Sequence, residues 1–330
     1  MSNDVESGSA SARIIGNPGR RDPRPPSRRV GARARPLAAV ALAALATSGT
    51  AQAGPDINQH GLSGAWADVV TPGQGFVIET LPDLGGPGLG YVFGSWFTYD
   101  VVPGEETSNR WYTFQADVVG GSSEADVVIY QSTGGVFGGA ALTTTVPVGS
   151  GTIAFDSCTS GSFSYTFDDG RAGTIPIYRL MPDVACEDHG LPADISNDFA
   201  LSGAWADPTT TAQGMVIEVN PQLQYAFLAW FTYTWNESAR EELSNQRWFT
   251  GQRPYAVGQD VITFDLYETT GGVFDGMAPT TTVPVGEATI RFRSCTEAEL
   301  DYTFTAGSLV DHTGTMQLSR IAVAPSVCPN

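Results

Sequence analysis

Apolar and polar residues alternate with period two along most of this chain, as in β-strands that bury one face. Ile153 and Phe155 share one predicted strand face, whereas Thr152, Ala154 and Asp156 share the other. Such segments are rich in β-branched and aromatic residues, and Gly, Pro, Asp and Ser separate them. The pattern predicts short antiparallel strands, and no stretch after the first 53 residues has the periodicity of an amphipathic helix.

The alternating pattern is duplicated within the chain. Residues 62–68 and 201–207 both read LSGAWAD, and the later blocks recur in the same order. The matched blocks are 74–79 with 213–218, 96–99 with 230–233, 110–111 with 247–248, 133–137 with 270–274, 143–149 with 280–286, 157–159 with 294–296, and 165–167 with 302–304. The sequence therefore predicts two copies of one β-domain, residues 54–186 and 200–330, with a linker at 187–199.

Each copy contains about eight predicted strands, which close as an antiparallel β-barrel or pack as a β-sandwich. The first strand of each copy carries G-x-W, with Trp66 or Trp205, and the last carries Arg179 or Arg320. By the alternation, both arginines lie on the apolar face and need an indole ring or a carboxylate as partner. We expect these four residues to be structural, and the pairing favours the barrel.

The first 53 residues resemble a signal peptide. Several arginines precede the apolar run 37–46, and Ala51-Gln52-Ala53 is typical of a cleavage site. The apolar run is too short for a membrane-spanning helix. We expect cleavage after Ala53, a secreted or periplasmic protein, and no transmembrane anchor.

Removal of this leader takes away eight arginines and three acidic residues. The chain has 17 basic and 35 acidic residues, so the remainder has nine and 32, a net charge of 9 − 32 = −23. A surface this acidic repels phosphate backbones, which argues against nucleic acid as a partner. The acidic residues are scattered, with no calcium-binding motif, so we predict no metal and no cofactor.

Four cysteines follow the leader, at equivalent places in the two copies. An even number in an exported chain favours one disulfide in each copy. We predict the pairs Cys158–Cys186 and Cys295–Cys328. No histidines accompany them to suggest a zinc site.

Aromatic residues are the strongest candidates for ligand binding. Trp96, Trp111, Trp230 and Trp248 are matched between the copies, and Trp96 and Trp230 lie on the opposite strand face from the aromatic stripes around residues 91–99 and 225–233. That face would bind a ligand or be covered by a loop. The candidate site residues are Trp96, Trp111, Glu79 and Gln74 in the first copy and Trp230, Trp248, Glu218 and Gln213 in the second.

Catalysis has little support in the sequence. No nucleophile or metalloenzyme motif occurs, and none of His60, His189 and His312 is matched between the copies. Asp68 with Glu79 is the one acid pair that both copies retain for glycoside hydrolysis. The simpler interpretation is that Glu79 forms a structural ion pair with Arg110 within its own barrel, as Glu218 does with Arg247. We predict no enzyme.

Two resemblances follow from these motifs. The G-x-W with a distant arginine resembles the signature of calycins, the lipocalin-like and avidin-like barrels. The order GxW, GQGxxIE, WFTY, RW, TGGxF, SCT, YTF, Arg and Cys resembles a repeat domain of secreted, mostly proteobacterial proteins. The resemblance implies a secreted β-domain and no particular activity.

Two functional hypotheses remain. In the first, the paired aromatic residues bind a small ligand or a glycan without catalysis, and tandem copies add avidity. In the second, the protein is a structural or protein-interaction component of the cell envelope, with filled barrels. An open cavity at Trp96 and Trp230 would favour the first hypothesis, and plugged barrels would favour the second.

Overall fold

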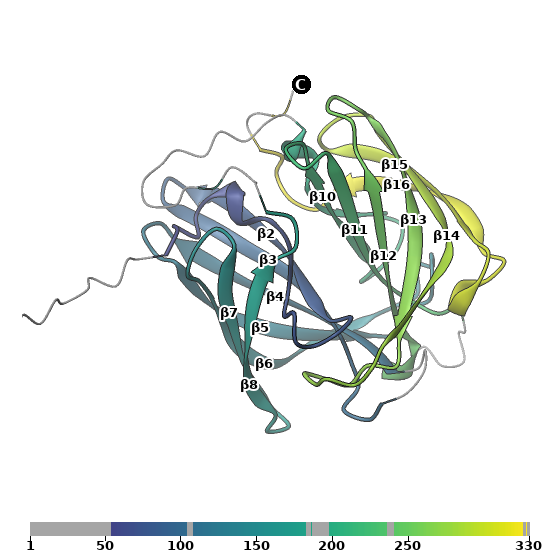
Figure 1. Ribbon diagram of the computed structural model, residues 1–330, viewed down its shortest axis with the longest axis horizontal. Coiled ribbons are helices and arrows are strands. Elements are labelled where there is room, and N and C mark those ends of the chain that lie inside the picture. The colour runs from purple at the N-terminus through teal and green to yellow at the C-terminus, as the bar shows by residue number, and fades with distance from the viewer. Residues whose placement is uncertain are drawn as a thin grey trace, which may run out of the picture. The chain divides into compact units, whose positions relative to one another are not determined.

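Each copy of the repeat folds as an eight-stranded antiparallel barrel (Figure 1). The computed structural model describes residues 54–103, 108–182, 186, 198–235, 241–325 and 328, so the predicted leader and most of the linker lie outside the described residues. Barrel 1 consists of β1 (Gly64–Ala67), β2 (Gly75–Gly86), β3 (Leu89–Tyr99), β4 (Asn109–Val119), β5 (Glu124–Thr133), β6 (Thr144–Phe155), β7 (Ser160–Phe167) and β8 (Ala172–Arg179).

Barrel 2 repeats this arrangement. It consists of β9 (Gly203–Ala206), β10 (Gly214–Asn220), β11 (Tyr225–Tyr233), β12 (Gln246–Pro254), β13 (Val261–Thr270), β14 (Thr281–Phe292), β15 (Glu297–Phe304) and β16 (Thr313–Arg320). Short 3-10 turns precede some strands: η1 (His60–Leu62), η3 (Phe199–Leu201), η5 (Leu243–Asn245) and η6 (Gly307–Leu309).

The short G-x-W strand closes each barrel. Trp66 on β1 pairs with Phe76 on β2 and with Arg179 on β8. In the second barrel, Trp205 on β9 occupies the same position between Met215 and Arg320. The prediction of two all-β barrels is confirmed, and the alternative of two sandwiches is wrong.

Aromatic side chains fill both barrels. The rings are packed closely; for example, the centroids of Phe76 and Phe163 are 4.9 Å apart and those of Phe249 and Phe304 are 4.8 Å apart. Because residues alternate between the two faces of a strand, every second residue contributes to this interior. The largest fully buried interior side chains are Trp66, Trp96, Phe114, Phe155 and Phe163 in barrel 1 and Trp205, Trp230, Phe249 and Phe264 in barrel 2.

One disulfide joins the two ends of each barrel's last hairpin. The Cα atoms of Cys158 and Cys186 are 5.9 Å apart, and those of Cys295 and Cys328 are 6.0 Å apart. The bridges tie the β6–β7 turn and the β14–β15 turn, which precede the last hairpins, to the segments after β8 and β16. The predicted pairing is confirmed, and paired cysteines are typical of an oxidising compartment.

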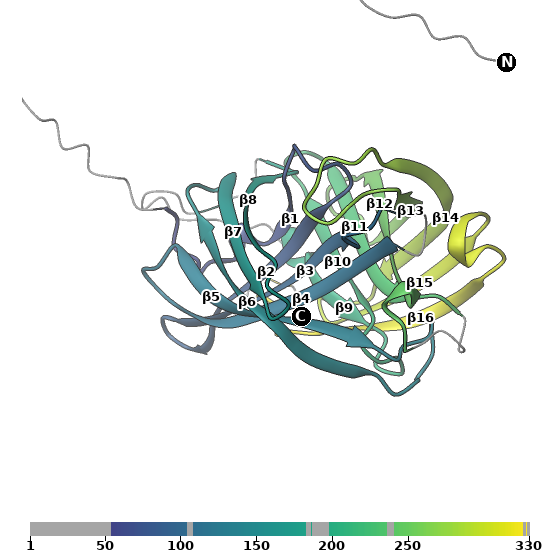
Figure 2. The same ribbon diagram turned by 90° about the horizontal axis from the view of Figure 1, so that it is seen from below.

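The outer faces of β2–β4 and β10–β12 are also buried, because the two barrels pack against each other there (Figures 1 and 2). The aromatic stripe of residues 91–99 therefore lies between the barrels, whereas Trp96 points into barrel 1. The inter-barrel core contains five matched pairs, which are Ala65, Val77, Phe97, Tyr99 and Trp111 with Ala204, Val216, Phe231, Tyr233 and Trp248, and also Ala229, whose counterpart in copy 1 is Ser95.

Candidate functional site

Trp96 and Trp230, the central ligand-binding candidates, lie inside filled barrels. Each indole is about 1% exposed. The Trp96 ring is 5.2 Å from that of Tyr165 and 5.5 Å from that of Phe163, measured between centroids. No open lumen in the described residues reaches either indole, so both tryptophans act as packing groups.

A loop from the opposite copy closes the end of each barrel. Phe274, from the TGGVF block of copy 2, lies against Trp96, Tyr165 and Phe167 of barrel 1 at centroid distances of 5.2 to 5.8 Å. Phe137 of copy 1 lies against Trp230, Tyr302 and Phe304 of barrel 2 at 5.5 to 5.8 Å. The exchange is reciprocal, so each copy completes the core of the other.

Gln74 and Gln213 hold these exchanged loops. The Gln74 amide nitrogen donates to the carbonyl oxygens of Val273 and Gly276, at 3.0 and 3.2 Å. The Gln213 amide nitrogen donates to those of Val136 and Gly139, at 2.9 and 3.2 Å. Each glutamine is thus a clamp for the loop that enters its own barrel.

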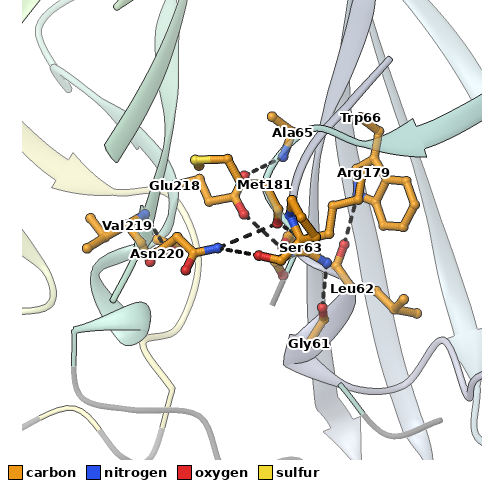
Figure 3. A network of polar contacts seen from close by, with 12 residues as sticks. Gly61, Leu62, Ser63, Ala65, Trp66, Arg179, Met181, Glu218, Val219 and Asn220 are labelled. Atoms are coloured by element: carbon orange, nitrogen blue, oxygen red, sulfur yellow. Dashed lines mark hydrogen bonds and ion pairs between the residues drawn. The ribbon is translucent and has the colours of Figure 1, made fainter. Parts of the chain in front are cut away.

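Glu79 and Glu218 also reach across to the opposite copy. Glu79 Oε1 is 3.0 Å from Nη2 of Arg320, and its Oε2 accepts a hydrogen bond from the Ala204 amide at 2.8 Å. Glu218 forms the matched pair with Arg179 at 3.2 Å and accepts from the Ala65 amide at 2.6 Å (Figure 3). The two ion pairs link the barrels next to the short strands β1 and β9 that close them.

The same arginines pack on the G-x-W indoles. The guanidinium carbon of Arg179 lies 5.4 Å from the Trp66 ring centroid, and that of Arg320 lies 5.8 Å from the Trp205 ring centroid. Arg179 also donates to the carbonyl oxygens of Gly61 and Met181, at 2.7 and 3.0 Å. The sequence predicted an indole or a carboxylate as partner, and each arginine has both.

Burial governs the ionisation of these groups. It raises the pKa of Glu79 and Glu218, and the arginine and the backbone amide each lower that pKa in part. Burial also lowers the pKa of Arg179. Since an unpaired charge here would have neither water nor a counter-ion, each pair depends on both members.

The glycine of G-x-W leaves room for the carboxylate of the opposite copy. Gly64 has a φ of +140° and Gly203 has a φ of +148°, both unfavourable for residues with a side chain. A Cβ at Gly64 would lie 2.5 Å from Glu218 Oε1, and one at Gly203 would lie 2.4 Å from Glu79 Oε1. The motif therefore serves the inter-barrel contact as well as barrel closure.

Trp111 and Trp248 complete the reciprocal set. The Trp111 indole nitrogen donates to the Thr232 carbonyl at 3.0 Å, and that of Trp248 donates to the Thr98 carbonyl at 3.2 Å. All eight candidate ligand-binding residues thus lie in the barrel cores or at the inter-barrel interface. The structure brings them together as contacts between the two copies.

The ion pairs predicted within each barrel, Glu79 with Arg110 and Glu218 with Arg247, are wrong. Glu79 pairs with Arg320 and Glu218 with Arg179, each in the other copy, and Arg110 pairs with Asp100. Asp68 accepts from the Val70 amide at 2.9 Å in a local turn. Asp68 and Glu79, the acid pair considered for glycoside hydrolysis, therefore both form structural contacts.

Phe137 and Phe274 are the important residues that the sequence analysis missed as functional candidates. Both were visible in the repeated TGGVF block, but a glycine-rich loop between strands is typical of a turn. The available signal was the Val-Phe pair that follows two glycines in both copies. That these phenylalanines pack in the opposite barrel can be recognised only from the three-dimensional structure.

In the described part of the chain, no group of three or more His, Cys, Asp or Glu residues could hold a metal ion. The same residues include no helix with the length and apolar character needed to cross a membrane. No protein-family model, curated protein or solved structure matches this chain. The site must therefore be interpreted from its own geometry.

Proposed function

We propose that this chain is a non-catalytic structural or protein-interaction protein of the cell envelope or the extracellular space, acting through its outer surface. The observation that carries the proposal is that both barrels are filled and each is closed by a phenylalanine of the other. The paired cysteines support an oxidising compartment.

The repeated motifs support the same proposal. Most of their aromatic and charged side chains pack inside the barrels or contact the other copy, so we assign recognition to the outer strand faces and loops where the copies differ. The outer face of β14 and β15 carries ion pairs, and Arg293, directly after β14, pairs with Glu299 at 2.6 Å. The equivalent residues of copy 1 are Asp156, directly after β6, and Ser162 on β7, and this face of barrel 1 is rich in small hydroxyl residues.

Co-sedimentation of the mature chain with envelope fragments tests the proposal. We expect saturable binding that unlabelled protein displaces. The double variant Ser162→Glu/Ser164→Asp places the acids of copy 2 on copy 1, and we expect it to weaken binding by about tenfold or more if this face makes the contact. The matched control is Glu299→Ser/Asp301→Ser in copy 2, which should bind as the wild type does.

Titration with polysaccharides and apolar ligands is the experiment that could contradict the proposal. If intrinsic tryptophan fluorescence changed saturably, and Trp96→Ala and Trp230→Ala abolished the change while the fold stayed intact, the barrels would be ligand sites. That result would contradict the proposal and favour the glycan or small-ligand hypothesis.

A further inference from the structure

A groove of about 420 Å³ lies between the two barrels, outside both interiors. One side is formed by the outer face of β11–β13, with Phe227, Thr250 and Tyr267. The other side is formed by the loop between β1 and β2, which includes Val69, and by Leu180. Its volume is within the roughly 300 to 1,000 Å³ range of small-molecule sites.

A small residue interrupts the aromatic stripe of β11 where it lines the groove. Ala229 lies between Phe227 and Phe231 on the same strand face and pairs with Thr250 on β12. Thr250 pairs in turn with Tyr267 on β13. This row of small and half-buried side chains is flanked by aromatic residues, which leaves a hollow with an apolar floor.

Several polar side chains in the groove have no hydrogen-bond partner among the described residues. The side chains of Thr250, Gln252 and Tyr267 make no hydrogen bond in the described part of the chain, although all three line the groove. They are neutral donors and acceptors grouped on one wall. By contrast, Gln74 is already committed to the exchanged loop.

Charge and exposure restrict the ligand further. Asp68 is the one ionisable acid of the lining, which contains no arginine, lysine or histidine. The chain after the predicted leader is strongly acidic, so an anion would be repelled. At the mouth, Val69 is 75% exposed and Leu180 is 51% exposed, so two apolar groups face solvent where an apolar ligand would cover them.

We infer that this groove binds a small, neutral, ring-containing apolar compound with one or two hydroxyl or carbonyl groups. The ring lies on the apolar floor formed by Phe97, Ala229 and Trp248, and the polar group bonds with Thr250, Gln252 or Tyr267. This binding activity goes beyond the proposed surface interaction and does not depend on it.

Nile red, an uncharged fluorescent ring compound, is the probe for this site. We expect one saturable site per chain, with a blue shift and an increase of dye emission. Thr250→Trp fills the groove and should weaken dye affinity by about tenfold or more. The matched control is Thr113→Trp, the equivalent change in β4 of copy 1 on the other side of the interface, which should leave dye affinity unchanged.

Ligand class is tested by displacement of the bound dye. We expect 2-naphthol, which is neutral, to displace it, and 2-naphthoate, which is an anion of similar shape, to do so about tenfold or more weakly. If Thr250→Trp does not fold, Gln252→Trp with its counterpart Gln115→Trp replaces the pair, since residue 252 is exposed.

Four results would overturn the inference. The first is that the dye shows no saturable binding. The second is that Thr250→Trp leaves dye affinity unchanged, and the third is that Thr250→Trp and Thr113→Trp lower it equally. The fourth is that 2-naphthol and 2-naphthoate displace the dye equally well. None of these results depends on envelope co-sedimentation, so failure of the groove inference and failure of the proposed surface function are separable.

Discussion

At the residue scale, Phe137 and Phe274 show how one copy of the repeat completes the other. Each is attached to its own barrel by the chain but is packed in the opposite barrel. The backbone follows the same exchange, because the Phe274 amide donates to the Asp100 carbonyl and the Phe137 amide donates to the Thr234 carbonyl, both at 2.9 Å. A substitution of either phenylalanine in one copy should therefore destabilise the core of the other copy.

Phe274→Ala tests this coupling. Phe274 is half-buried beside Trp96, so we expect its truncation to lower the free energy of unfolding by about 2 to 3 kcal/mol, measured by denaturant titration. Met277→Ala, in the same loop but 74% exposed, is the control and should change stability by less than about 0.5 kcal/mol. Equal stability of the two variants would contradict the plugging role.

The buried ion pairs give a second prediction. Glu79→Gln leaves Arg320 without a counter-ion in a site where both side chains are at most 3% exposed, and we expect a loss of about 3 to 5 kcal/mol. Asp301→Asn breaks an exposed pair with Arg291, which solvent screens, and should leave the free energy of unfolding close to that of the wild type. Denaturant titration of both variants checks the difference, and similar small losses would argue against a buried pair.

His60 makes stability dependent on pH. Burial and nearby Arg320 lower the pKa of His60 from 6.5 to about 4, so the native state keeps the ring neutral where the unfolded chain binds a proton. Its contribution is therefore complete above pH 6.5 and is lost as pH falls towards 4. At pH 5 the loss is about 2 kcal/mol relative to pH 7.

The second copy supplies the control for this histidine, because Phe199 occupies the equivalent position. We expect His60→Phe to unfold with a smaller change of denaturant midpoint between pH 7 and pH 5 than the wild type. An identical pH dependence of the two proteins would show that His60 does not carry the effect.

At the element scale, the G-x-W strands are short but have three tasks. Each closes its barrel, presents a tryptophan to the interior and leaves space for the glutamate of the opposite copy. The need for this space explains why the first residue of G-x-W is a glycine. A side chain there would displace both members of an ion pair, since a Cβ at Gly203 would lie 2.4 Å from both Glu79 Oε1 and Arg320 Nη2.

Gly203→Ala separates this contact from backbone strain. We expect a loss of about 3 kcal/mol or more, because the methyl group adds disruption of the ion pair to the cost of a positive φ. Gly258→Ala is the control: Gly258 has a φ of +81°, but a Cβ there would meet no atom within 4 Å. It should cost about 1 kcal/mol, from strain alone. Equal losses in the two variants would contradict the steric account.

The strands were largely predictable from the sequence, whereas their partners were not. Alternation identified Ile153 and Phe155 as interior residues, and β6 confirms it. In β2 and β3, however, both faces are apolar, and alternation cannot tell a barrel interior from an interface. The position of Arg179 on the apolar face predicted a carboxylate or an indole, but nothing local specified Glu218 of the other copy.

At the scale of the whole molecule, the two barrels form an internal pair related by the repeat. Of the motifs that the copies share, GxW closes the barrels, and GQGxxIE, WFTY, RW and TGGVF supply side chains to the barrel interiors or to contacts with the other barrel. The six tryptophans that are repeated in both copies are therefore buried packing residues. The outer face of β6–β8 and the inter-barrel groove, which we propose as sites, could not be recognised before the strands were placed side by side.

The central claim is that the two copies complete each other, and calorimetric unfolding of residues 54–330 tests it most directly. Since each barrel lacks part of its core without the other, we expect a single transition whose calorimetric and van't Hoff enthalpies agree for the whole two-barrel unit. The account would be contradicted by two separate transitions, if Phe274→Ala also left the transition of barrel 1 and the tryptophan signal of that barrel unchanged.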